Sequence, residues 1–334
     1  MRVKINMKQV SAGITSNVEV MPGIYLMWLE APDIALISHP GQFITVNCEG
    51  STLRRPFSIH QTVIANRSSE QSKETANPAH VPRQIKGGAN EGHHLSEMAL
   101  LFKVVGKGTF WLSQRQRGDN IDILGPLGKG FTIAPSAKNL LLVAGGIGIA
   151  PLIFLAQHAS PHHSVSLIHG VSTARELYPL TKVDSQQSSS HYPRLQTNDS
   201  QVATNLSEGI RFIPATEDGT AGEKGMLTEI LPRFLDWADQ VFACGPVDMY
   251  KAMANMSSRT EALNRSSEHS EETAKGQRNN LKLRKCQVSL EMRMGCGIGA
   301  CYGCTINTKK GSKQVCRDGP VFELDDILWQ EVRI

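Results

Sequence analysis

Cys286-Gln-Val-Ser-Leu-Glu-Met-Arg-Met-Gly-Cys296-Gly-Ile-Gly-Ala-Cys301-Tyr-Gly-Cys304 is the stretch around which this 334-residue chain is organised, and Cys316 follows it. From Cys296 onward the spacing is C-x4-C-x2-C, then eleven residues, then the last cysteine. Glycines stand at positions 295, 297, 299 and 303 of this run. Glycine lets a backbone adopt positive φ and turn tightly, so the run predicts a loop whose N–H groups can point at sulfur.

The cysteine spacing favours a [2Fe–2S] cluster held by Cys296, Cys301, Cys304 and Cys316, because its opening matches the plant-type pattern. A structural zinc site usually shows two C-x2-C-like pairs, and here there is one. Disulfides are the third alternative, but the N-terminal residues contain no apolar signal core and cytosolic thiols stay reduced. The last cysteine comes early and the chain ends at Ile334, so we expect a small cluster module, residues 285–334, attached to something larger.

Length and composition narrow the class of protein. A chain of this length predicts two or three domains. Its net charge of +4, with acids and bases mixed along the sequence, is too weak a bias to indicate nucleic acid or a membrane surface. No apolar run is long enough to span a bilayer, so we expect a soluble, cytoplasmic protein.

Residues 1–135 have the pattern of a small antiparallel β-barrel. Short runs rich in β-branched and aromatic residues alternate with Gly, Pro and Asn, as is typical of such barrels. The runs are Val18-Glu-Val-Met, Ile24-Tyr-Leu-Met-Trp-Leu, Phe43-Ile-Thr-Val, Phe102-Lys-Val-Val and Ile121-Asp-Ile-Leu. The stretch Gly125-Pro-Leu-Gly-Lys-Gly-Phe131 is predicted to be a loop that closes the barrel.

Two stretches of the barrel could bind a flavin nucleotide. In Arg54-Arg-Pro-Phe-Ser-Ile59 a guanidinium can fork onto a phosphate, and the serine hydroxyl can bond a flavin ring or ribose. In Val105-Gly-Lys-Gly-Thr-Phe110, Gly108 and Thr109 could present an N–H and a hydroxyl to a pyrophosphate. Taken alone, each stretch is also an ordinary turn, so both interpretations stay open at this point.

Residues 136–284 predict a parallel-sheet α/β domain. The pattern of a strand, a glycine turn and a helix is found in Leu140-Leu-Leu-Val-Ala-Gly-Gly-Ile-Gly-Ile-Ala-Pro151-Leu-Ile-Phe-Leu-Ala. Its unbroken apolar strand suggests a parallel sheet that is covered on both faces. The turn Gly145-Gly146-Ile147-Gly148 lets the backbone approach a phosphate at the start of that helix. Further strands are expected from Ser164, Arg211 and Val241, the last running into Cys244-Gly245-Pro246. A turn that binds nothing, and a cysteine that only packs, are the alternatives.

Three polar segments interrupt these domains, at about 66–96, about 184–208 and about 257–280. They are rich in Ser, Glu, Gln and Asn and carry few residues that could form a core. Such segments bury too little apolar surface to order themselves, so we predict surface insertions. Asn66-Arg-Ser-Ser-Glu-Gln-Ser-Lys-Glu-Thr-Ala76 nearly repeats as Asn264-Arg-Ser-Ser-Glu-His-Ser-Glu-Glu-Thr-Ala274.

The chain combines a flavin-binding barrel, a nucleotide-binding α/β domain and a [2Fe–2S] module, in that order. In this it resembles the ferredoxin–NADP reductase superfamily, and more closely the electron-transfer subunits of two-subunit, NAD-dependent dihydroorotate dehydrogenases. The resemblance covers the chain apart from the three insertions, and its C-terminal cysteine motif is the most specific part. The other matching motifs are Arg55-Pro-Phe-Ser58, Leu101-Phe-Lys-Val-Val-Gly-Lys-Gly-Thr109, Gly145-Gly-Ile-Gly-Ile-Ala-Pro151, Cys244-Gly-Pro246 and Cys316-Arg-Asp-Gly-Pro-Val-Phe322.

The resemblance implies a role for each matching residue. FAD is expected at Arg55, Pro56, Phe57, Ser58, Leu101, Phe102, Lys103, Gly108 and Thr109. The NAD pyrophosphate is expected at Gly145, Gly146 and Gly148, the nicotinamide beside Cys244, Gly245 and Pro246, and the cluster at its four cysteines. The family's usual tyrosine is Phe57 here, so no hydroxyl bond can come from that position. The first insertion separates two flavin stretches in the sequence. Each doubling of loop length adds only about 0.6 kcal/mol to the entropic cost of closing the loop, so the insertion is compatible with an intact site.

The resemblance also implies a partner and a direction. NAD exchanges a hydride, a cluster exchanges single electrons and FAD does both, so FAD belongs between them. Electrons are expected to pass from the FMN of a dihydroorotate dehydrogenase catalytic subunit through the cluster and FAD to NAD+, in pyrimidine biosynthesis. Two copies of each subunit are expected, and this chain supplies no acid–base residue to the oxidation. The alternatives are a reductase subunit for a hydrogenase, ferredoxin or oxygenase system, and a redox sensor or scaffold with a degenerate nucleotide site.

Overall fold

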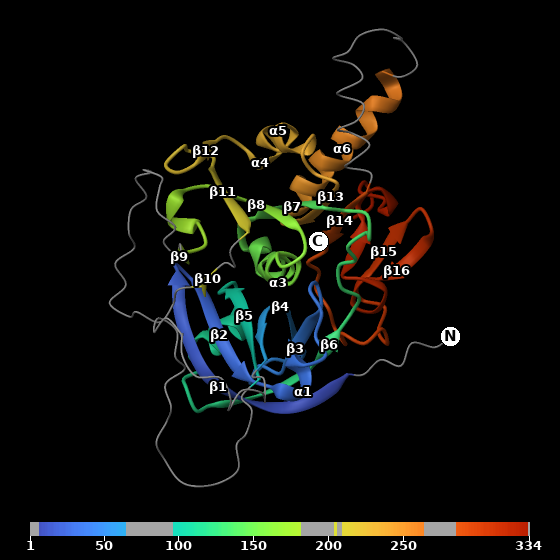
Figure 1. Ribbon diagram of the computed structural model, residues 1–334. Helices are drawn as coiled ribbons and strands as arrows, with labels where there is room; N and C mark the ends of the chain where they lie inside the picture. The colour runs from blue at the N-terminus through green and yellow to red at the C-terminus, as the bar shows by residue number, and fades with distance from the viewer. Residues whose placement is uncertain (1–6, 65–95, 182–203, 206–208, 264–284, 333–334) are drawn as a thin grey trace.

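A closed six-stranded barrel is followed by a seven-stranded sheet in the computed structural model of the chain (Figure 1). The structure describes residues 7–64, 96–181, 204–205, 209–263 and 285–332. Most of the three predicted insertions therefore lies outside the described residues. The order of barrel, parallel-sheet domain and C-terminal cysteine segment confirms the fold class predicted from the sequence.

The barrel closes in the order β1-β2-β5-β4-β3-β6, with β6 pairing antiparallel to β1. Its strands are β1 (Lys8–Met21), β2 (Ile24–Glu30), β3 (Phe43–Val46), β4 (Arg55–Val63), β5 (Glu97–Lys103) and β6 (Asn120–Leu127). Two short helices, α1 (Pro32–Ala35) and α2 (Lys107–Ser113), lie between the strands in the sequence. Alternate apolar side chains fill the interior, among them Ile14, Leu29, Ile44, Ile59 and Leu100.

Two details of the barrel differ from the sequence prediction. The strand expected at Phe102–Val105 is β5, which ends at Lys103, and Val105 beyond it is 79% exposed. The stretch expected to be a loop from Gly125 begins inside β6, where Gly125 pairs with Lys8. A Cβ on Gly125 would lie 2.6 Å from Cγ2 of Ile44, so this strand passes the core too closely for a side chain.

The second sheet has the strand order β12-β11-β8-β7-β13-β14-β17 and is parallel except at its last pair. Its strands are β7 (Asn139–Gly145), β8 (Ser164–Val171), β11 (Ile210–Thr216), β12 (Glu223–Lys224), β13 (Gln240–Cys244), β14 (Cys286–Ser289) and β17 (Val321–Glu323). A short parallel pair, β9 (Leu180–Thr181) and β10 (Thr204–Asn205), lies apart from it. The last two strands of the sheet come from the C-terminal segment.

Helices cover both faces of this sheet. The turn η1 (Gly146–Gly148) leads into α3 (Ile149–Ala159), which lies between the barrel and the sheet (Figure 1). Because α3 is covered on two sides, its apolar residues are buried nearly all round, and the barrel's Leu26 and Leu101 join the same core. No helix among the described residues combines the length and apolarity needed to cross a bilayer.

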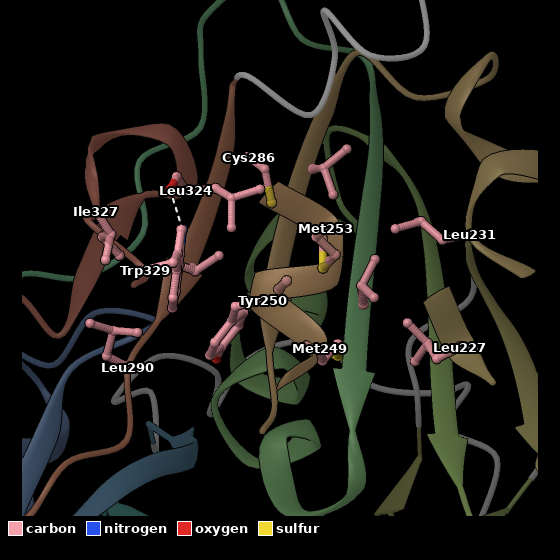
Figure 2. Packing of buried hydrophobic residues seen from close by; sticks show 14 of the residues in the cluster. Leu227, Leu231, Met249, Tyr250, Met253, Cys286, Leu290, Leu324, Ile327 and Trp329 are labelled. Atoms are coloured by element: carbon pink, nitrogen blue, oxygen red, sulfur yellow. Dashed lines mark hydrogen bonds between the residues drawn. The ribbon is translucent and has the colours of Figure 1, made fainter. Parts of the chain in front are cut away.

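The opposite face carries α4 (Leu227–Ile230), α5 (Pro232–Leu235) and α6 (Val247–Leu263). Figure 2 shows Met249, Tyr250 and Met253 of α6 packed between the sheet and the C-terminal residues. The rings of Tyr250 and Trp329 lie 5.3 Å apart, and the Trp329 indole donates to the Leu324 carbonyl at 2.8 Å. Helix α6 continues to Leu263, into the range expected as the third insertion.

The rest of the C-terminal segment forms a hairpin, β15 (Thr305–Thr308) and β16 (Gly311–Gln314), followed by α8 (Val315–Asp318) and η3 (Leu324–Asp326). η2 (Ala174–Glu176) completes the described elements. The hairpin residue Ile306 and the α8 residue Val315 belong to the same core as α6. The cysteine segment therefore shares its hydrophobic core with the α/β domain.

Candidate functional site

The four cysteines predicted as cluster ligands lie as two pairs. Cys301 is hydrogen-bonded to Sγ of Cys296, and Cys316 to Sγ of Cys304, in each case through the backbone N–H of the later cysteine. The backbone N–H of Gly299 donates to Sγ of Cys316 at 3.1 Å, which holds the glycine loop beside the second pair. Cys304 and Cys316 are buried, Cys296 is half-buried and Cys301 is exposed.

Backbone N–H groups surround the sulfur atoms, as the glycine pattern predicted. Sγ of Cys296 accepts from the N–H of Ala300 at 3.3 Å and of Cys301 at 3.4 Å. Sγ of Cys301 accepts from Gly303, and Sγ of Cys304 from Cys316, each at 3.4 Å. Positive φ at Gly297 (74°), Gly299 (83°) and Tyr302 (60°) turns the loop so that these groups point inward.

The two pairs differ electrostatically. Burial works to raise the pKa of the Cys296 thiol, but hydrogen bonds from the N–H groups of Ile298, Cys301 and Ala300 outweigh it and lower the pKa to about 6. Burial, the bond to Cys304 and the charge of that neighbour raise the pKa of Cys316 to about 12. The surroundings of Cys296 therefore favour its thiolate form. Cys316 favours the protonated thiol, and a bound cation would be needed to stabilise its thiolate.

The donor set fits an iron–sulfur cluster: four sulfur atoms, with N–H groups directed at sulfur. Within the part of the chain that the structure describes, no three His, Cys, Asp or Glu side chains form a ready-made metal-binding group. The assignment of Cys296, Cys301, Cys304 and Cys316 as ligands therefore stays a prediction, supported by their pairing and by the N–H donors.

The cysteine loop lies on the wall of the barrel. A Cβ on Gly297 would be 2.9 Å from Cγ2 of Thr45 and 3.5 Å from Cδ1 of Leu127. Thr45 belongs to β3 and stands opposite Pro56 of β4 in the strand register. The loop is thus one strand away from the predicted flavin stretch.

The two predicted flavin stretches meet in space despite the long segment between them. Arg55 begins β4, and Gly108 is in the first turn of α2. A Cβ on Gly108 would lie 3.2 Å from both Cγ and Nε of Arg55 and 3.4 Å from Oγ of Ser51. The Arg55 guanidinium donates to the Leu53 carbonyl at 3.0 Å and has capacity for more acceptors.

The remaining predicted flavin residues divide into two groups. Phe57 and Phe102 are buried in the barrel, with their rings 5.7 Å apart, and Leu101 is buried in the core shared with the sheet. The Thr109 hydroxyl accepts from the N–H of Val105 at 2.9 Å and of Gly106 at 3.1 Å, so it closes its own helical turn. Pro56 and Ser58 are half-buried, and Lys103 is exposed.

The predicted nucleotide turn lies directly against the Cys244-Gly245-Pro246 stretch. A Cβ on Gly145 would be 2.8 Å from Cδ of Pro246, and one on Gly148 would overlap the Cys244 carbonyl. The two stretches meet because β7 and β13 are neighbouring parallel strands that end together. Gly146 has a φ of 53°, and a Cβ on it would meet nothing within 4 Å, so it faces open space.

The Cys244 thiol is part of the protein core. It is buried and donates to the Ser289 carbonyl at 3.5 Å. Burial, and the nearby Glu291 carboxylate, raise the pKa of Cys244 to about 12, so the thiol stays protonated at neutral pH. This environment favours the alternative in which the Cys244 side chain packs in the core and has no chemical role.

Sequence reasoning missed two residues that hold this region in place. The Tyr250 hydroxyl, labelled in Figure 2, accepts from the Gly245 N–H at 2.8 Å and donates to the Ser289 carbonyl at 2.7 Å. His169 lies 2.9 Å from the Gly146 carbonyl through its Nε2. Neither residue belongs to a local motif; His169 stands out only as a polar residue at the end of a largely apolar stretch, and Tyr250 has no such signal.

Comparisons with known proteins agree with this architecture. Residues 291–328 match the family described as iron–sulfur cluster binding domain of dihydroorotate dehydrogenase B. The chain is 32% identical to the dihydroorotate dehydrogenase B (NAD(+)) electron transfer subunit of Desulforamulus reducens, over 93% of this chain and 95% of that one. It is 30% identical to the protein of the same name from Caldanaerobacter subterraneus subsp. tengcongensis, over 96% and 99% of the two chains.

A solved structure of an NADH-dependent reduced ferredoxin-NADP oxidoreductase is similar with a TM-score of 0.63. It is 22% identical in sequence, and the match covers 96% of this chain and 91% of that one. This similarity supports the fold alone.

Proposed function

The chain belongs to the family of dihydroorotate dehydrogenase B (NAD(+)) electron transfer subunits, and from this premise we propose that it carries electrons between a dehydrogenase partner and NAD+ through a [2Fe–2S] cluster and FAD. The observation that carries the proposal is the place of the cysteine loop. Gly297 lies against Thr45, and Thr45 pairs with the strand that bears Arg55 to Ser58. This places the loop that carries the proposed cluster ligands beside the strand that carries the proposed flavin residues.

Bound FAD exchanges a hydride with nicotinamide and single electrons with an iron–sulfur cluster. The Arg55 guanidinium offers forked N–H donors for a phosphate, and Gly108 beside it leaves room for the backbone to approach. Ser58, three residues along β4, supplies a hydroxyl on a half-buried position. Phe57 and Phe102 support the strands from inside the barrel.

The turn from Gly145 to Gly148 is proposed to hold the dinucleotide. Its open side at Gly146 leaves backbone accessible at the start of α3, an arrangement that favours phosphate. Cys244, Gly245 and Pro246 border it and are anchored through the Tyr250 hydroxyl. The neutral, buried Cys244 thiol makes this border uncharged.

Cys296, Cys301, Cys304 and Cys316 are proposed to ligate the cluster. The backbone N–H groups directed at sulfur stabilise its negative charge. Cys301 is exposed and so is Tyr302, at 66%, which leaves this side of the loop open to a partner. We propose that the partner is the FMN-containing catalytic subunit, that two copies of each assemble, and that the complex works in the cytoplasm.

Co-purification with candidate FMN subunits, followed by an assay of dihydroorotate-dependent NAD+ reduction, tests the proposal. Activity is expected with the partner and not with either subunit alone. A complex that turns over only hydrogen or ferredoxin would contradict the substrate assignment. Anaerobically purified protein that contains neither iron nor acid-labile sulfide would contradict the cluster.

A further inference from the structure

Three buried polar side chains form a chain between the barrel and the nucleotide turn. His60 is on β4, His169 is on β8, and Tyr178 follows η2; all three are at most 3% exposed. Nδ1 of His60 lies 2.8 Å from the Ala150 carbonyl, and its Nε2 lies 2.8 Å from the Tyr178 hydroxyl. The Tyr178 N–H lies 3.4 Å from Nδ1 of His169, whose Nε2 lies 2.9 Å from the Gly146 carbonyl.

The hydrogen-bond partners determine the tautomer of each ring. A carbonyl oxygen only accepts, so His60 carries its proton on Nδ1 and His169 on Nε2. The second nitrogen of His169 must then accept from the Tyr178 N–H, and that of His60 accepts the tyrosine hydroxyl proton. Neutral rings satisfy every bond of the chain, and burial lowers the pKa of both histidines to about 4.

The two ends of this chain hold one short segment. Gly146 is in the turn and Ala150 is in the first turn of α3, so the bonded carbonyls lie on either side of Gly148, one of the residues proposed to face the dinucleotide. His60 links this segment to the barrel, because it lies two residues beyond Ser58 on β4, the strand proposed to contact the flavin. The rings of His60 and Tyr178 also pack edge to face, with centroids 5.4 Å apart.

We propose that His60, Tyr178 and His169 are positioning residues that fix the nucleotide turn relative to the flavin strand. The inference rests on the proposed dinucleotide site. None of the three touches the dinucleotide in this scheme; they act through the carbonyls of Gly146 and Ala150. Loss of the His169 bond leaves the Gly146 carbonyl free to rotate, and the turn then pays for its ordering when the dinucleotide binds.

The test compares His169→Leu with His169→Gln in the FAD- and cluster-containing subunit. A glutamine amide can replace the Nε2–H donor, and leucine cannot. We expect His169→Leu to raise the Kd for NAD+, measured by calorimetric titration, about tenfold, which corresponds to about 1.4 kcal/mol. His169→Gln is expected to restore binding to within about threefold, within the range of one net hydrogen bond. In NADH oxidation with ferricyanide, the change should appear in KM more than in kcat.

Tyr178→Phe and His163→Leu complete the set. Tyr178→Phe removes only the hydroxyl bond to His60 and keeps the ring and the N–H to His169, so a smaller increase in Kd is expected. His163 bonds the Ala159 carbonyl at 3.1 Å at the far end of α3, so His163→Leu is a matched control and should leave Kd unchanged. Equal Kd values for His169→Leu and the unsubstituted protein, or equal increases in the leucine and glutamine variants, would overturn the inference. An unsubstituted subunit that binds no NAD+ would overturn the proposed function instead.

Discussion

Gly297 of the cysteine loop lies against Thr45 of the barrel, so closely that a Cβ on Gly297 would be 2.9 Å from the Thr45 methyl group. The φ of Gly297 is 74°, a conformation that costs other residues about 1–2 kcal/mol. We therefore expect Gly297→Ala to destabilise the loop by at least this amount and to move it away from the barrel. Slower NADH-driven reduction of a one-electron acceptor, with FAD content unchanged, is the expected readout.

Thr45→Ser separates the two effects of that substitution, because it removes the methyl group and keeps the hydroxyl. In a double-mutant cycle, Thr45→Ser should recover part of the electron-transfer rate lost in Gly297→Ala, since only the backbone strain remains. Additive effects of the two substitutions would show that the contact does not hold the loop.

Gly108→Ala should weaken flavin binding without weakening the fold. The new methyl group would crowd the Arg55 side chain at 3.2 Å, whereas alanine favours a helix over glycine by about 1 kcal/mol. We expect a lower FAD content after purification together with an unchanged or higher Tm of the apoprotein. Gly13→Ala is the control, since its Cβ would meet only Asn120 Oδ1 at 3.7 Å. Full FAD content in Gly108→Ala would argue against Arg55 as a phosphate ligand.

Cys301→Ser should interrupt electron transfer to the partner subunit and spare NADH oxidation by two-electron acceptors. Cys301 is the exposed member of its pair, and serine is a poor ligand for iron. Iron and acid-labile sulfide analysis should show a lost or unstable cluster. Cys48→Ser is the control: Cys48 lies in the buried core of the barrel, so this variant is expected to have the same iron content as the unsubstituted protein. Unchanged transfer to the partner in Cys301→Ser would contradict the proposed path.

Acid should destabilise the protein through its two buried histidines. Burial lowers the pKa of His60 and His169 to about 4, against about 6.5 in an unfolded chain. Between pH 4 and pH 6.5 the unfolded chain binds protons that the folded chain does not. The two histidines therefore leave the free energy of unfolding unchanged above pH 6.5 and lower it as the pH falls toward 4. Each histidine contributes up to about 1.4 kcal/mol per pH unit.

His169→Gln removes one of the two titrating groups, so the Tm of this variant should fall less steeply between pH 7 and pH 5.5. Thermal unfolding followed by circular dichroism at several pH values measures the two slopes. Parallel slopes in the variant and the unsubstituted protein would show that His169 is not the source of the acid sensitivity.

Local patterns in the sequence predicted much of the fold. Val18, Ile24 and Phe43 lie in barrel strands as expected, and the apolar run before Gly145 is a central strand of the parallel sheet. The family resemblance is confirmed by similarity over nearly the whole chain. The Gly-Lys-Gly stretch near Gly108 forms a helix that was not expected, because glycine is a poor helix former and tertiary contacts decide its conformation.

Contacts between distant segments could not be predicted in this way. His60 and His169 come from two strands and Tyr178 from the loop after η2, and each looks like an isolated polar residue in its own stretch. The same holds for Tyr250, which bridges Gly245, just beyond β13, and Ser289 at the end of β14. Sequence spacing singled out four cysteines as cluster ligands, but it did not predict that Cys301 would bond Sγ of Cys296 and Cys316 would bond Sγ of Cys304.

The strand β14 is hydrogen-bonded to β13 on one side and to β17 on the other. Loss of the C-terminal segment from Cys286 onward would therefore remove two strands of the second sheet and leave β13 as an unpaired edge, which could pair with other chains. The C-terminal segment and the α/β domain therefore form one folding unit, and we expect the cysteine loop not to fold when it is expressed without that domain.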